Sequence, residues 1–340
     1  MPANRKDLIL AGDIGGTKTF LGLFTPSGGA PVEVRSEKFV NAGFSGVAEV
    51  IEAFIKEGEA GRIGAASLGA ACPVEANRCT LTNIHWTVDG EALRKKFRIK
   101  RLGLMNDLAA MGWGVGLLSK KDIMTINEGV PKEGNAALIA AGTGLGEAIL
   151  FWDGKAHTPS SSEGGHTDFG ARTTLEVELL GYLMEEFGHV SYERILSGPG
   201  IENVYRFLLS REGKSVPGRI EKMFAVEGVD RAVIDEAIKG KDRTCARAIE
   251  LFLSIYGAEA GNLALKGMAM GGVYVGGGIA PKVFASADAG PFMDAFVDKG
   301  RFRDFMSRLP VRLILNDRTA LLGAARYGAG LLKGRAAGGG

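Results

Sequence analysis

Two segments of the chain repeat one pattern, and this repetition restricts the possible folds more than any other feature. Residues 8–24 and 136–152 each consist of an apolar run, a turn of glycine and threonine, and a second apolar run. Because strand-like sequence lies on both sides of each turn, the pattern predicts β-hairpins rather than the strand–turn–helix unit of dinucleotide-binding folds. Two similar hairpins in one chain indicate a duplicated core that binds a ligand between its halves.

The remaining sequence alternates strand and helix patterns and therefore predicts an α/β fold. Buried strands are expected at 63–71, 101–105 and 311–315. Apolar residues at helical spacing predict helices at 46–58, 107–118, 173–187, 199–211, 230–238, 242–265 and 319–332. A third glycine turn, within residues 273–284, follows a strand and leads into a helix.

Chain length and the distribution of these elements predict two domains. The chain has 340 residues, and about 150 residues per domain is a common size. The first part of the sequence is strand-rich and the middle is helix-rich. We expect a small α/β domain of residues 1–117 plus 320–340, to which the final helix returns, and a large α/β domain of residues 118–319.

Charge and composition argue against several classes of partner. Lys and Arg (41) nearly balance Asp and Glu (39), and the formal net charge is +2. Such a balance does not favour binding to nucleic acid or to an anionic membrane surface. No apolar stretch approaches the ~18 residues of a membrane-spanning helix, and the N-terminal residues lack a signal-peptide core. We expect no nucleic-acid partner and no membrane partner.

The cysteines indicate the redox environment. There are three, Cys72, Cys79 and Cys245, and none forms a C-x-x-C pair. An odd and sparse set in a chain of this length argues against a disulfide framework and fits a reducing cytosol. We expect a cytoplasmic protein without a disulfide framework.

The glycine turns are candidate phosphate-binding loops. Glycines lack Cβ atoms, so the backbone amides of a turn can approach phosphate oxygens closely. The first turn also carries an acid that suits Mg²⁺, directly or through water, and a hydroxyl donor. It consists of Asp13, Ile14, Gly15, Gly16 and Thr17, and the second turn contains Gly142, Thr143 and Gly144. One loop with an acid and one without fits a metal-bound triphosphate held by two hairpins, whereas ligand-free glycine turns are the simpler alternative.

Two common nucleotide motifs are absent from the sequence. A P-loop ending in Gly213-Lys214-Ser215 would need glycine where Leu208 stands. The dinucleotide pattern G-x-G-x-x-G would start at Gly142, but Glu147 occupies its last position. Neither motif therefore competes with the hairpin interpretation.

A second candidate site follows the predicted strand at 101–105. Asn106 and Asp107 come directly after it, and the carboxyl ends of strands are where open α/β sheets bind ligands. An aspartate at this place can accept a proton from an attacking hydroxyl, while an asparagine amide can donate to and accept from another hydroxyl. Capping of the following helix is the alternative for Asp107.

Glu163 and His166 form a third candidate site. The paired glycines between them allow a tight turn, so that the carboxylate and the imidazole can converge on the vicinal hydroxyls of a sugar. Zinc is the rival ligand, but it needs roughly two more nitrogen or sulfur ligands. Residues 167–183 contain no Cys or His. Glu193, further along the chain, has no assignment from local pattern alone.

With these segments in place, the sequence resembles the bacterial glucokinase family of the sugar kinase/actin/Hsp70 superfamily. Residues 12–17 (GDIGGT, beginning at Gly12) are similar to the family's first phosphate loop. The segments around Asn83, around Asn106 and Asp107, and around Glu163 and His166 resemble its sugar-binding segments, and so does the segment that contains Glu193. Gly276, Gly277 and Gly278 resemble its adenosine loop.

The resemblance implies a fold, an activity and a set of ligands. It implies a two-domain actin-like ATPase (ribonuclease H-like) fold, with small and large α/β domains around a cleft. It further implies transfer of the γ-phosphate of ATP to the 6-hydroxyl of glucose, with Mg²⁺ as cofactor, and a homodimer. Asp107 would act as the general base, and Asn83, Asn106, Glu163, His166 and Glu193 would bind the sugar.

Several alternatives stay open at this stage. A related branch of repressors and kinases shares the Glu–Gly–x–His element but follows it with a zinc-binding cysteine cluster, which is absent here. We therefore expect a kinase rather than a regulator. The acceptor could be another hexose such as mannose, fructose or an amino sugar, and the donor could be ADP or polyphosphate. A sugar-sensing protein without turnover is the alternative from another functional class.

Overall fold

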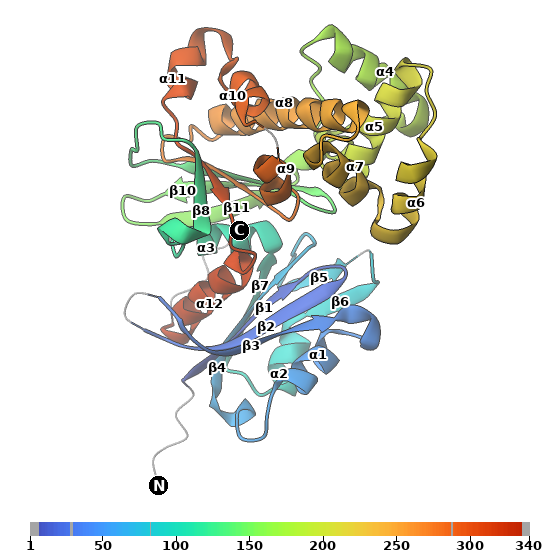
Figure 1. Ribbon diagram of the computed structural model, residues 1–340. Coiled ribbons are helices and arrows are strands. Elements are labelled where there is room, and N and C mark those ends of the chain that lie inside the picture. Colours follow the sequence, from blue (N-terminus) through green and yellow to red (C-terminus); the bar gives the residue numbers. More distant parts are fainter. Residues whose placement is uncertain (1–6, 28–29, 82, 287, 335–340) are drawn as a thin grey trace. The chain divides into compact units, whose positions relative to one another are not determined.

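The computed structural model describes residues 7–27, 30–81, 83–286 and 288–334 (Figure 1). The chain divides into two compact units. The first unit comprises Met1–Ser119, Lys155–Ser161 and Asn316–Gly340, and the second comprises Lys120–Gly154 and Ser162–Leu315. Each unit contains a mixed β-sheet with a glycine hairpin, so the predicted α/β class is confirmed.

The first unit is built on a five-stranded sheet of order β3-β2-β1-β4-β7. The strands are β1 (Leu8–Ile14), β2 (Lys18–Thr25), β3 (Val32–Val40), β4 (Ile63–Ala70) and β7 (Arg101–Asn106). β1 and β2 form the predicted hairpin, while β4 and β7 run parallel to β1. All eight residues of β4 are buried, as expected for an apolar strand inside a parallel arrangement. The carboxyl ends of β1, β4 and β7 therefore lie at one edge of the sheet.

Four helices and a small hairpin complete this unit. They are α1 (Val47–Phe54), α2 (Gly90–Lys96), α3 (Asp107–Val115) and α12 (Thr319–Leu332), with the hairpin of β5 (Arg78–Leu81) and β6 (Trp86–Asp89). α12 packs on α3, β1 and β4. On β1, Leu8 and Leu10 belong to one buried cluster, whereas Ile9 and Ala11 belong to another that includes residues of α12. The alternation of side chains along the strand thus fills cores on both faces of the sheet.

Two predicted helices of this unit are shorter than the pattern indicated. The helix predicted at 46–58 ends at Phe54, because Ile55 is extended and Gly58 has a φ of 83°. The helix predicted at 107–118 ends at Val115. After α1 the apolar pattern continues because Ile55 also packs against the core.

The second sheet has six strands in the order β11-β10-β9-β12-β13-β8. They are β8 (Ile123–Asn127), β9 (Ala136–Ala141), β10 (Leu145–Trp152), β11 (His157–Ser162), β12 (Gly272–Gly276) and β13 (Val311–Ile314). β9 and β10 form the second predicted hairpin, and β12 runs parallel to both β9 and β13. The turns after β9 and β12 therefore lie next to each other.

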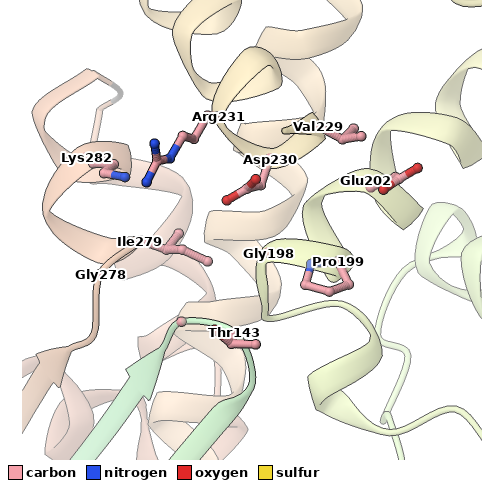
Figure 2. Close-up of a pocket in the computed structure, with 11 residues that line it drawn as sticks. Thr143, Gly198, Pro199, Glu202, Val229, Asp230, Arg231, Gly278, Ile279 and Lys282 are labelled. Atoms are coloured by element: carbon pink, nitrogen blue, oxygen red, sulfur yellow. The ribbon is translucent and has the colours of Figure 1, made fainter. Parts of the chain in front are cut away.

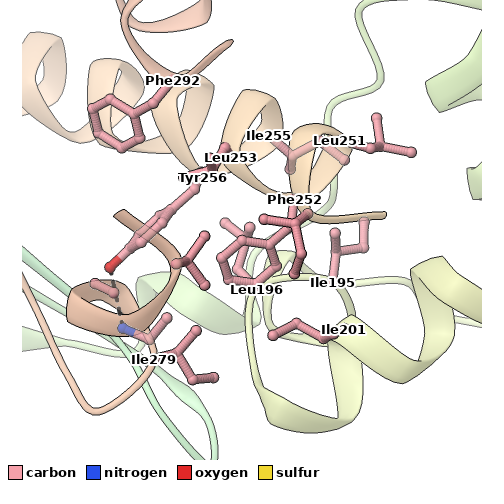
Figure 3. Close-up of a cluster of buried hydrophobic side chains, with 14 of the residues drawn as sticks. Ile195, Leu196, Ile201, Leu251, Phe252, Leu253, Ile255, Tyr256, Ile279 and Phe292 are labelled. Atoms are coloured by element: carbon pink, nitrogen blue, oxygen red, sulfur yellow. Dashed lines mark hydrogen bonds between the residues drawn. The ribbon is translucent and has the colours of Figure 1, made fainter. Parts of the chain in front are cut away.

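The second unit also contains eight helices within the described residues. These are α4 (Thr174–Phe187), α5 (Gly198–Arg211), α6 (Gly218–Glu227), α7 (Val229–Ile238), α8 (Arg243–Lys266), α9 (Ala280–Ser286), α10 (Gly290–Val297) and α11 (Arg303–Ser307). α8 is the longest and contributes Phe252 and Tyr256 to the core (Figure 3). The hydroxyl of Tyr256 accepts a hydrogen bond from the amide of Ala141 at 3.2 Å, so the core reaches the end of β9.

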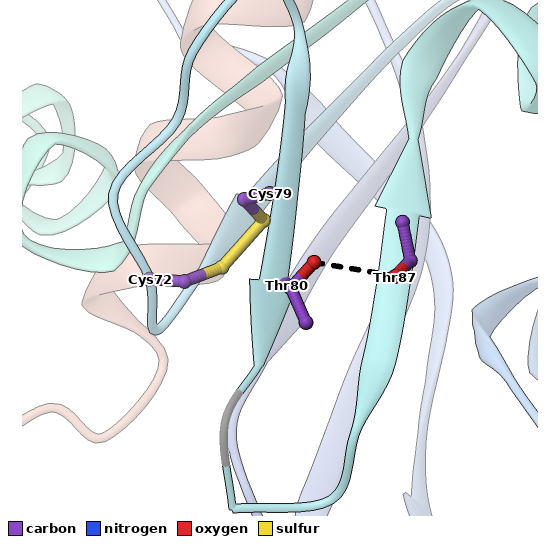
Figure 4. Close-up of a disulfide and its surroundings, with 4 residues drawn as sticks. All are labelled: Cys72, Cys79, Thr80 and Thr87. Carbon is purple, nitrogen blue, oxygen red and sulfur yellow. Dashed lines mark hydrogen bonds between the residues drawn. A yellow bond between two sulfur atoms is a disulfide. The ribbon is translucent and has the colours of Figure 1, made fainter.

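The structure has one disulfide, although the cysteine content argued against a disulfide framework. Cys72 and Cys79 are disulfide bonded, with their Cα atoms 6.1 Å apart, while Cys245 is free and buried (Figure 4). Ala76 and Asn77 adopt positive φ angles of 46° and 61° and turn the chain back between the two cysteines. The turn brings the cysteines together although their spacing matches no known motif.

Within the described residues, no helix combines the length and the apolar character that crossing a membrane requires.

Candidate active site

The first glycine turn, a candidate phosphate loop, joins β1 to β2 in a short, well-bonded turn. The amide of Gly15 donates to the carbonyl of Lys18 at 3.0 Å and closes the turn. Thr17 is exposed, and Gly15 and Gly16 are partly exposed. Gly12, by contrast, is buried inside β1, where a Cβ would come within 2.6 Å of Leu68. Gly12 is therefore a packing residue here rather than part of the open loop.

Asn41 holds this loop from behind. Its side-chain amide donates to the carbonyl of Gly15 at 2.8 Å, and its backbone amide donates to the carbonyl of Thr17 at 3.0 Å. Its side-chain oxygen accepts from the hydroxyl of Thr19 at 2.8 Å. Asn41 is only 3% exposed, so these hydrogen bonds are shielded from water. Sequence reasoning missed Asn41, because no local pattern connects it with a turn that lies more than twenty residues earlier.

Asp13 occupies an unusual electrostatic environment near the end of β1. Burial, and after it the nearby carboxylate of Asp107, raise the pKa of this carboxyl to about 7, while Lys38 opposes the shift. An acid in this state gains from a bound cation, which would stabilise its ionised form. Ile14, the next residue, packs into the core, so only its backbone remains for a ligand.

Asn106 and Asp107 lie at the same edge of the sheet as Asp13. Asp13 pairs with Gly69 of β4, and Gly69 pairs with Met105 of β7. Since neighbouring strands are ~4.8 Å apart, two strand spacings separate Asp13 from the end of β7. Gly69 has no side chain to fill the intervening position, and a Cβ there would come within 3.8 Å of the Asp107 backbone.

The capping alternative applies chiefly to Asn106. Asn106 is the N-cap of α3, and its side-chain oxygen accepts from the amide of Leu108 at 2.8 Å. Asp107 is the first helical residue, and its Oδ1 accepts from the same amide at 2.9 Å. The cap fixes the chain direction where β7 ends, and both side chains are partly exposed.

Asn83 lies beside the first phosphate loop. It is an exposed residue of the turn between β5 and β6, and a Cβ on Gly16 would be 3.6 Å from its side-chain nitrogen. The first unit thus brings together the loop after β1, Asn83, the last residue of β7 and the first residue of α3.

In the second unit, the three remaining predicted sugar residues converge. His166 lies between two acids: its Nε2 is 3.9 Å from Glu163 and its Nδ1 is 3.9 Å from Glu193. Glu163 directly precedes the turn η4 (Gly164–His166) and His166 is its last residue, while Glu193 belongs to η5 (Tyr192–Arg194). Glu193 therefore lies beside His166, a long-range neighbour that the local sequence pattern could not predict.

Glu193 also joins the second glycine loop. Its Oε2 accepts from the amide of Leu145, the first residue of β10, at 2.9 Å. Within the loop, the amide of Gly142 donates to the carbonyl of Gly144 at 2.8 Å, and the carbonyl of Gly142 accepts from the amide of Gly198 at 2.9 Å. The loop after β9 is thereby fixed to the start of α5.

The third turn requires glycine at one position. Gly277 has a φ of 86°, and a Cβ there would clash with the carbonyl of Ala141 at the end of β9. The carbonyl of Gly276 accepts from the hydroxyl of Tyr256 at 3.4 Å. The turn after β12 is therefore packed against the end of β9.

The second and third turns line one pocket of about 560 Å³ (Figure 2). Besides Gly142, Thr143 and Gly278, it is lined by residues from the starts of α5 and α7 and from α9. Backbone amides at helix starts favour anions such as phosphate. Sequence reasoning missed four charged lining residues because their helices carry no motif: Glu202, Asp230, Arg231 and Lys282.

The sequence predicts a Mg²⁺ site at Asp13. Among the residues that the structure describes, no group of three or more His, Cys, Asp or Glu side chains could hold a metal ion. Mg²⁺ typically uses one or two carboxylates and takes its other ligands from phosphates and water. The single loop carboxylate of Asp13 fits that donor set.

The arrangement of paired sheets, glycine hairpins and strand-end acids defines the fold as that of the two-domain, actin-like sugar kinases, which confirms the predicted fold class. The sequence profile of the family described as Glucokinase matches residues 10–330. The chain therefore belongs to the glucokinase family of enzymes, as the resemblance predicted.

Individual relatives agree with this assignment. A glucokinase of Nostoc sp. is 38% identical over 334 residues, which cover 94% of this chain and 98% of that protein. The crystal structure of a glucokinase from an Antarctic psychrotroph has a TM-score of 0.81 at 29% identity and covers 95% of this chain and 98% of that one. A ROK family glucokinase from Streptomyces griseus, in complex with glucose and AMPPNP, shares the fold with a TM-score of 0.62 at 19% identity. The match covers 94% of this chain and 99% of that one.

Proposed function

We propose that this enzyme transfers the γ-phosphoryl group of ATP to the 6-hydroxyl of glucose. The observation that carries the proposal is the shared sheet edge of Asp13 and Asp107. One acid stands beside a glycine loop suited to phosphates, and the other begins a helix two strands away, with Gly69 between them. Family membership and the glucose and AMPPNP bound to the Streptomyces griseus enzyme support the choice of substrates.

The nucleotide is assigned to the glycine loops. The pocket lined by Gly142, Thr143 and Gly278 is large enough for part of a nucleotide and offers amides at two helix starts. Asp230 and Glu202 supply acceptors that suit ribose hydroxyls, while Lys282 supplies a cation for phosphate. Asp13 would hold Mg²⁺, which when bound neutralises charge on the phosphates.

The sugar is assigned to Asn83, Asn106, Asp107, Glu163, His166 and Glu193. Carboxylates and the imidazole accept from and donate to the hydroxyls of the ring. Asp107 takes the proton of the 6-hydroxyl while that oxygen forms a bond to the γ-phosphorus. The bond from the γ-phosphorus to the β–γ bridging oxygen breaks, and ADP leaves with the bridging oxygen. A general base of this kind contributes about 10²–10⁴ in rate, and the rest comes from alignment and charge stabilisation.

A coupled assay for ADP release tests the proposal. Purified enzyme is given ATP with glucose, mannose, fructose or glucosamine, and glucose is then offered with ADP or polyphosphate as donor. We expect turnover with ATP and the highest kcat/KM for glucose. Preference for another hexose would correct the substrate, and saturable glucose binding without turnover would favour a sugar sensor.

Asp107→Asn tests the base directly. The variant should keep much of the glucose affinity and lose nearly all turnover, because it removes charge with little change of shape. Asp89→Asn is the matched control, since Asp89 caps α2 in the same unit and accepts from the amide of Ala92 at 2.9 Å. If Asp107→Asn retains a tenth of wild-type turnover, Asp107 is not the base.

We also propose that the enzyme is a homodimer, as the family resemblance implies. β3 is an outer strand of the first sheet, and it exposes Val32 and Val34, each 54% accessible. An exposed apolar edge strand is a surface that proteins usually cover or pair. Light scattering of the eluting protein during gel filtration gives the mass directly: a 35.8 kDa species would contradict the proposal.

A further inference from the structure

A group of buried polar side chains lies behind the two turns that carry the proposed sugar residues. Glu147 is central to it. This residue belongs to β10 and is 1% exposed. Gly164, which follows Glu163, lies so close that a Cβ on it would clash with the carboxyl group of Glu147. The hydroxyl of Ser162 donates to the carbonyl of Glu147 and accepts from the amide of Gly164 at 3.2 Å. The turn η4 therefore rests on Glu147.

A second buried acid faces the first. Glu259 of α8 is 0% exposed and lies close enough to Glu147 to raise the pKa of that carboxyl. With both acids ionised, Oε1 of each would be a buried acceptor without a hydrogen-bond donor among the described residues. Lys266 approaches Glu259 at 3.5 Å, which is an ion-pair distance rather than a good hydrogen bond. A proton on Glu147 supplies the missing donor, so the two acids together hold one proton.

From Glu259 the contacts continue to the other turn. Its Oε2 accepts from the side-chain amide of Asn262 at 2.8 Å, and the same amide donates to the hydroxyl of Tyr192 at 3.1 Å. The side-chain oxygen of Asn262 accepts a hydrogen bond from Lys299 at 2.6 Å, which fixes the orientation of the Asn262 amide. Tyr192 is buried and directly precedes Glu193. The η5 turn is thus supported through Asn262 by the same buried acid, Glu259.

The two turns are also joined directly, since the amide of Tyr192 donates to the carbonyl of Thr167 at 3.1 Å. We propose that the proton-sharing pair of Glu147 and Glu259 positions Glu163, His166 and Glu193 for the sugar. These two acids touch neither substrate nor reacting atoms; they are positioning residues. The inference rests on the proposed function for its kinetic readout and has a structural readout of its own.

Variants at Glu147 separate positioning from general stability. Glu147→Gln keeps a neutral side chain that donates to Glu259, so its glucose KM at pH 7 should stay within about twofold of wild type. Glu147→Leu removes the donor and the polar contact. Because small displacements of positioned groups are costly, its glucose KM should rise by about 10–100-fold, with little change in the KM for ATP.

Glu236→Leu is the matched control. Glu236 is also a buried acid of the second unit, 3% exposed and ion-paired with Arg219 of α6, but it contacts neither turn among the hydrogen bonds of the described residues. The control should lower the melting temperature without changing the glucose KM. Equal rises of the glucose KM in Glu147→Leu and Glu236→Leu would overturn the proposal, because destabilisation alone would then explain the effect.

Hydrogen exchange in the ligand-free protein provides the second readout. Amides of residues 163–168 and 191–195 should exchange faster in Glu147→Leu than in wild type, and not in Glu236→Leu. This measurement needs no turnover, so it remains decisive if the wild-type enzyme phosphorylates no hexose and the proposed function fails. Unchanged exchange in both turns of Glu147→Leu would overturn the positioning role even if kinase activity is established.

Dependence on pH distinguishes Glu147 from its neighbours. Burial raises the pKa of Glu147 to about 8, Glu259 adds to the shift, and Lys266 opposes it. Lys299 titrates in the same range, since burial lowers its pKa to about 8. The wild-type glucose KM should rise above about pH 8, and this rise should be absent in Glu147→Gln. A rise that persists in Glu147→Gln would assign it to Lys299 and contradict the shared proton.

Discussion

The carboxylate of Glu193 occupies the space that a Cβ atom on Gly144 would need. The carboxyl carbon would be only 3.2 Å from such a Cβ, and Oε2 would be closer still. Oε2 also accepts from the amide of Leu145 at 2.9 Å. A residue proposed to bind the sugar therefore packs directly on a loop proposed to bind the nucleotide, so the shape of the second glycine turn and the position of Glu193 depend on each other.

Gly144→Ala should consequently impair glucose binding although the substitution lies in a phosphate loop. The added methyl group displaces the Glu193 carboxylate, and we expect the glucose KM to rise by about tenfold or more. Gly181→Ala in α4 is the control, because a Cβ there has no neighbour within 4 Å. Steady-state kinetics with glucose varied at saturating ATP provides the measurement. An effect on the ATP KM alone would show that Glu193 moves without consequence for the sugar.

Asn41→Ala should loosen the first phosphate loop. The substitution leaves the partly buried carbonyl of Gly15 without its donor, which costs about 1 kcal/mol of stability. It should also raise the KM for ATP more than that for glucose, because the loop amides lose their support. Thr19→Val is the comparison: it removes the bond to the Asn41 oxygen and keeps the bond to Gly15. Denaturant unfolding and kinetics of both variants check the prediction, which fails if Thr19→Val affects the ATP KM as strongly.

The disulfide should contribute modestly to stability. Closing a loop of about eight residues restricts the unfolded chain by about 2–3 kcal/mol in the loop-entropy treatment. Reduction, or Cys72→Ser, should lower the free energy of unfolding by up to that amount. Thiol titration of the denatured protein should find one free thiol, Cys245, before reduction and three after it. Three thiols in freshly purified protein would contradict the disulfide between Cys72 and Cys79.

The sequence predicted features that depend on local order. Both hairpins, the third glycine turn and the long helix α8 follow from the spacing of apolar residues and glycines over short stretches. Strand β3 was missed because its residues are mostly exposed or partly exposed, so it lacks the apolar pattern of a buried strand. Likewise β11 is an outer strand and largely polar.

The parts of the candidate site that the sequence could not predict depend on contacts between distant residues. Asn41 reaches Gly15 across the antiparallel strands β2 and β3, and Glu259 reaches Glu147 from a helix more than a hundred residues later. Neither Asn41 nor Glu259 belongs to a sequence motif, because each supports a residue that lies far away in the chain. The Cys72–Cys79 pair was missed for a similar reason, because two left-handed residues between them create the turn.

Protonation of Asp13 should limit activity at low pH. Burial raises the pKa of its carboxyl from 3.8 to about 7, with Asp107 adding to the shift. Below about pH 7 the acid is protonated in the free enzyme and cannot serve as a cation ligand. We therefore expect kcat/KM for ATP to fall about tenfold per pH unit below that value. Higher Mg²⁺ concentrations should move the fall to lower pH, because a bound cation favours the ionised acid.

The same shift predicts how stability depends on pH. Between about pH 4 and pH 7 the folded state keeps the Asp13 proton while the unfolded state has lost it, so the folded state binds more protons. The free energy of unfolding must then decrease as pH rises through this window, by at most about 1.4 kcal/mol per pH unit from this one group. Asp13→Asn removes the contribution, and its stability should exceed that of wild type at pH 8. Denaturant unfolding of both proteins at pH 5, 6.5 and 8 provides the measurement. If the difference in unfolding free energy between wild type and Asp13→Asn does not change with pH, the pKa of Asp13 is not raised. The predicted loss of activity at low pH would then lose its basis.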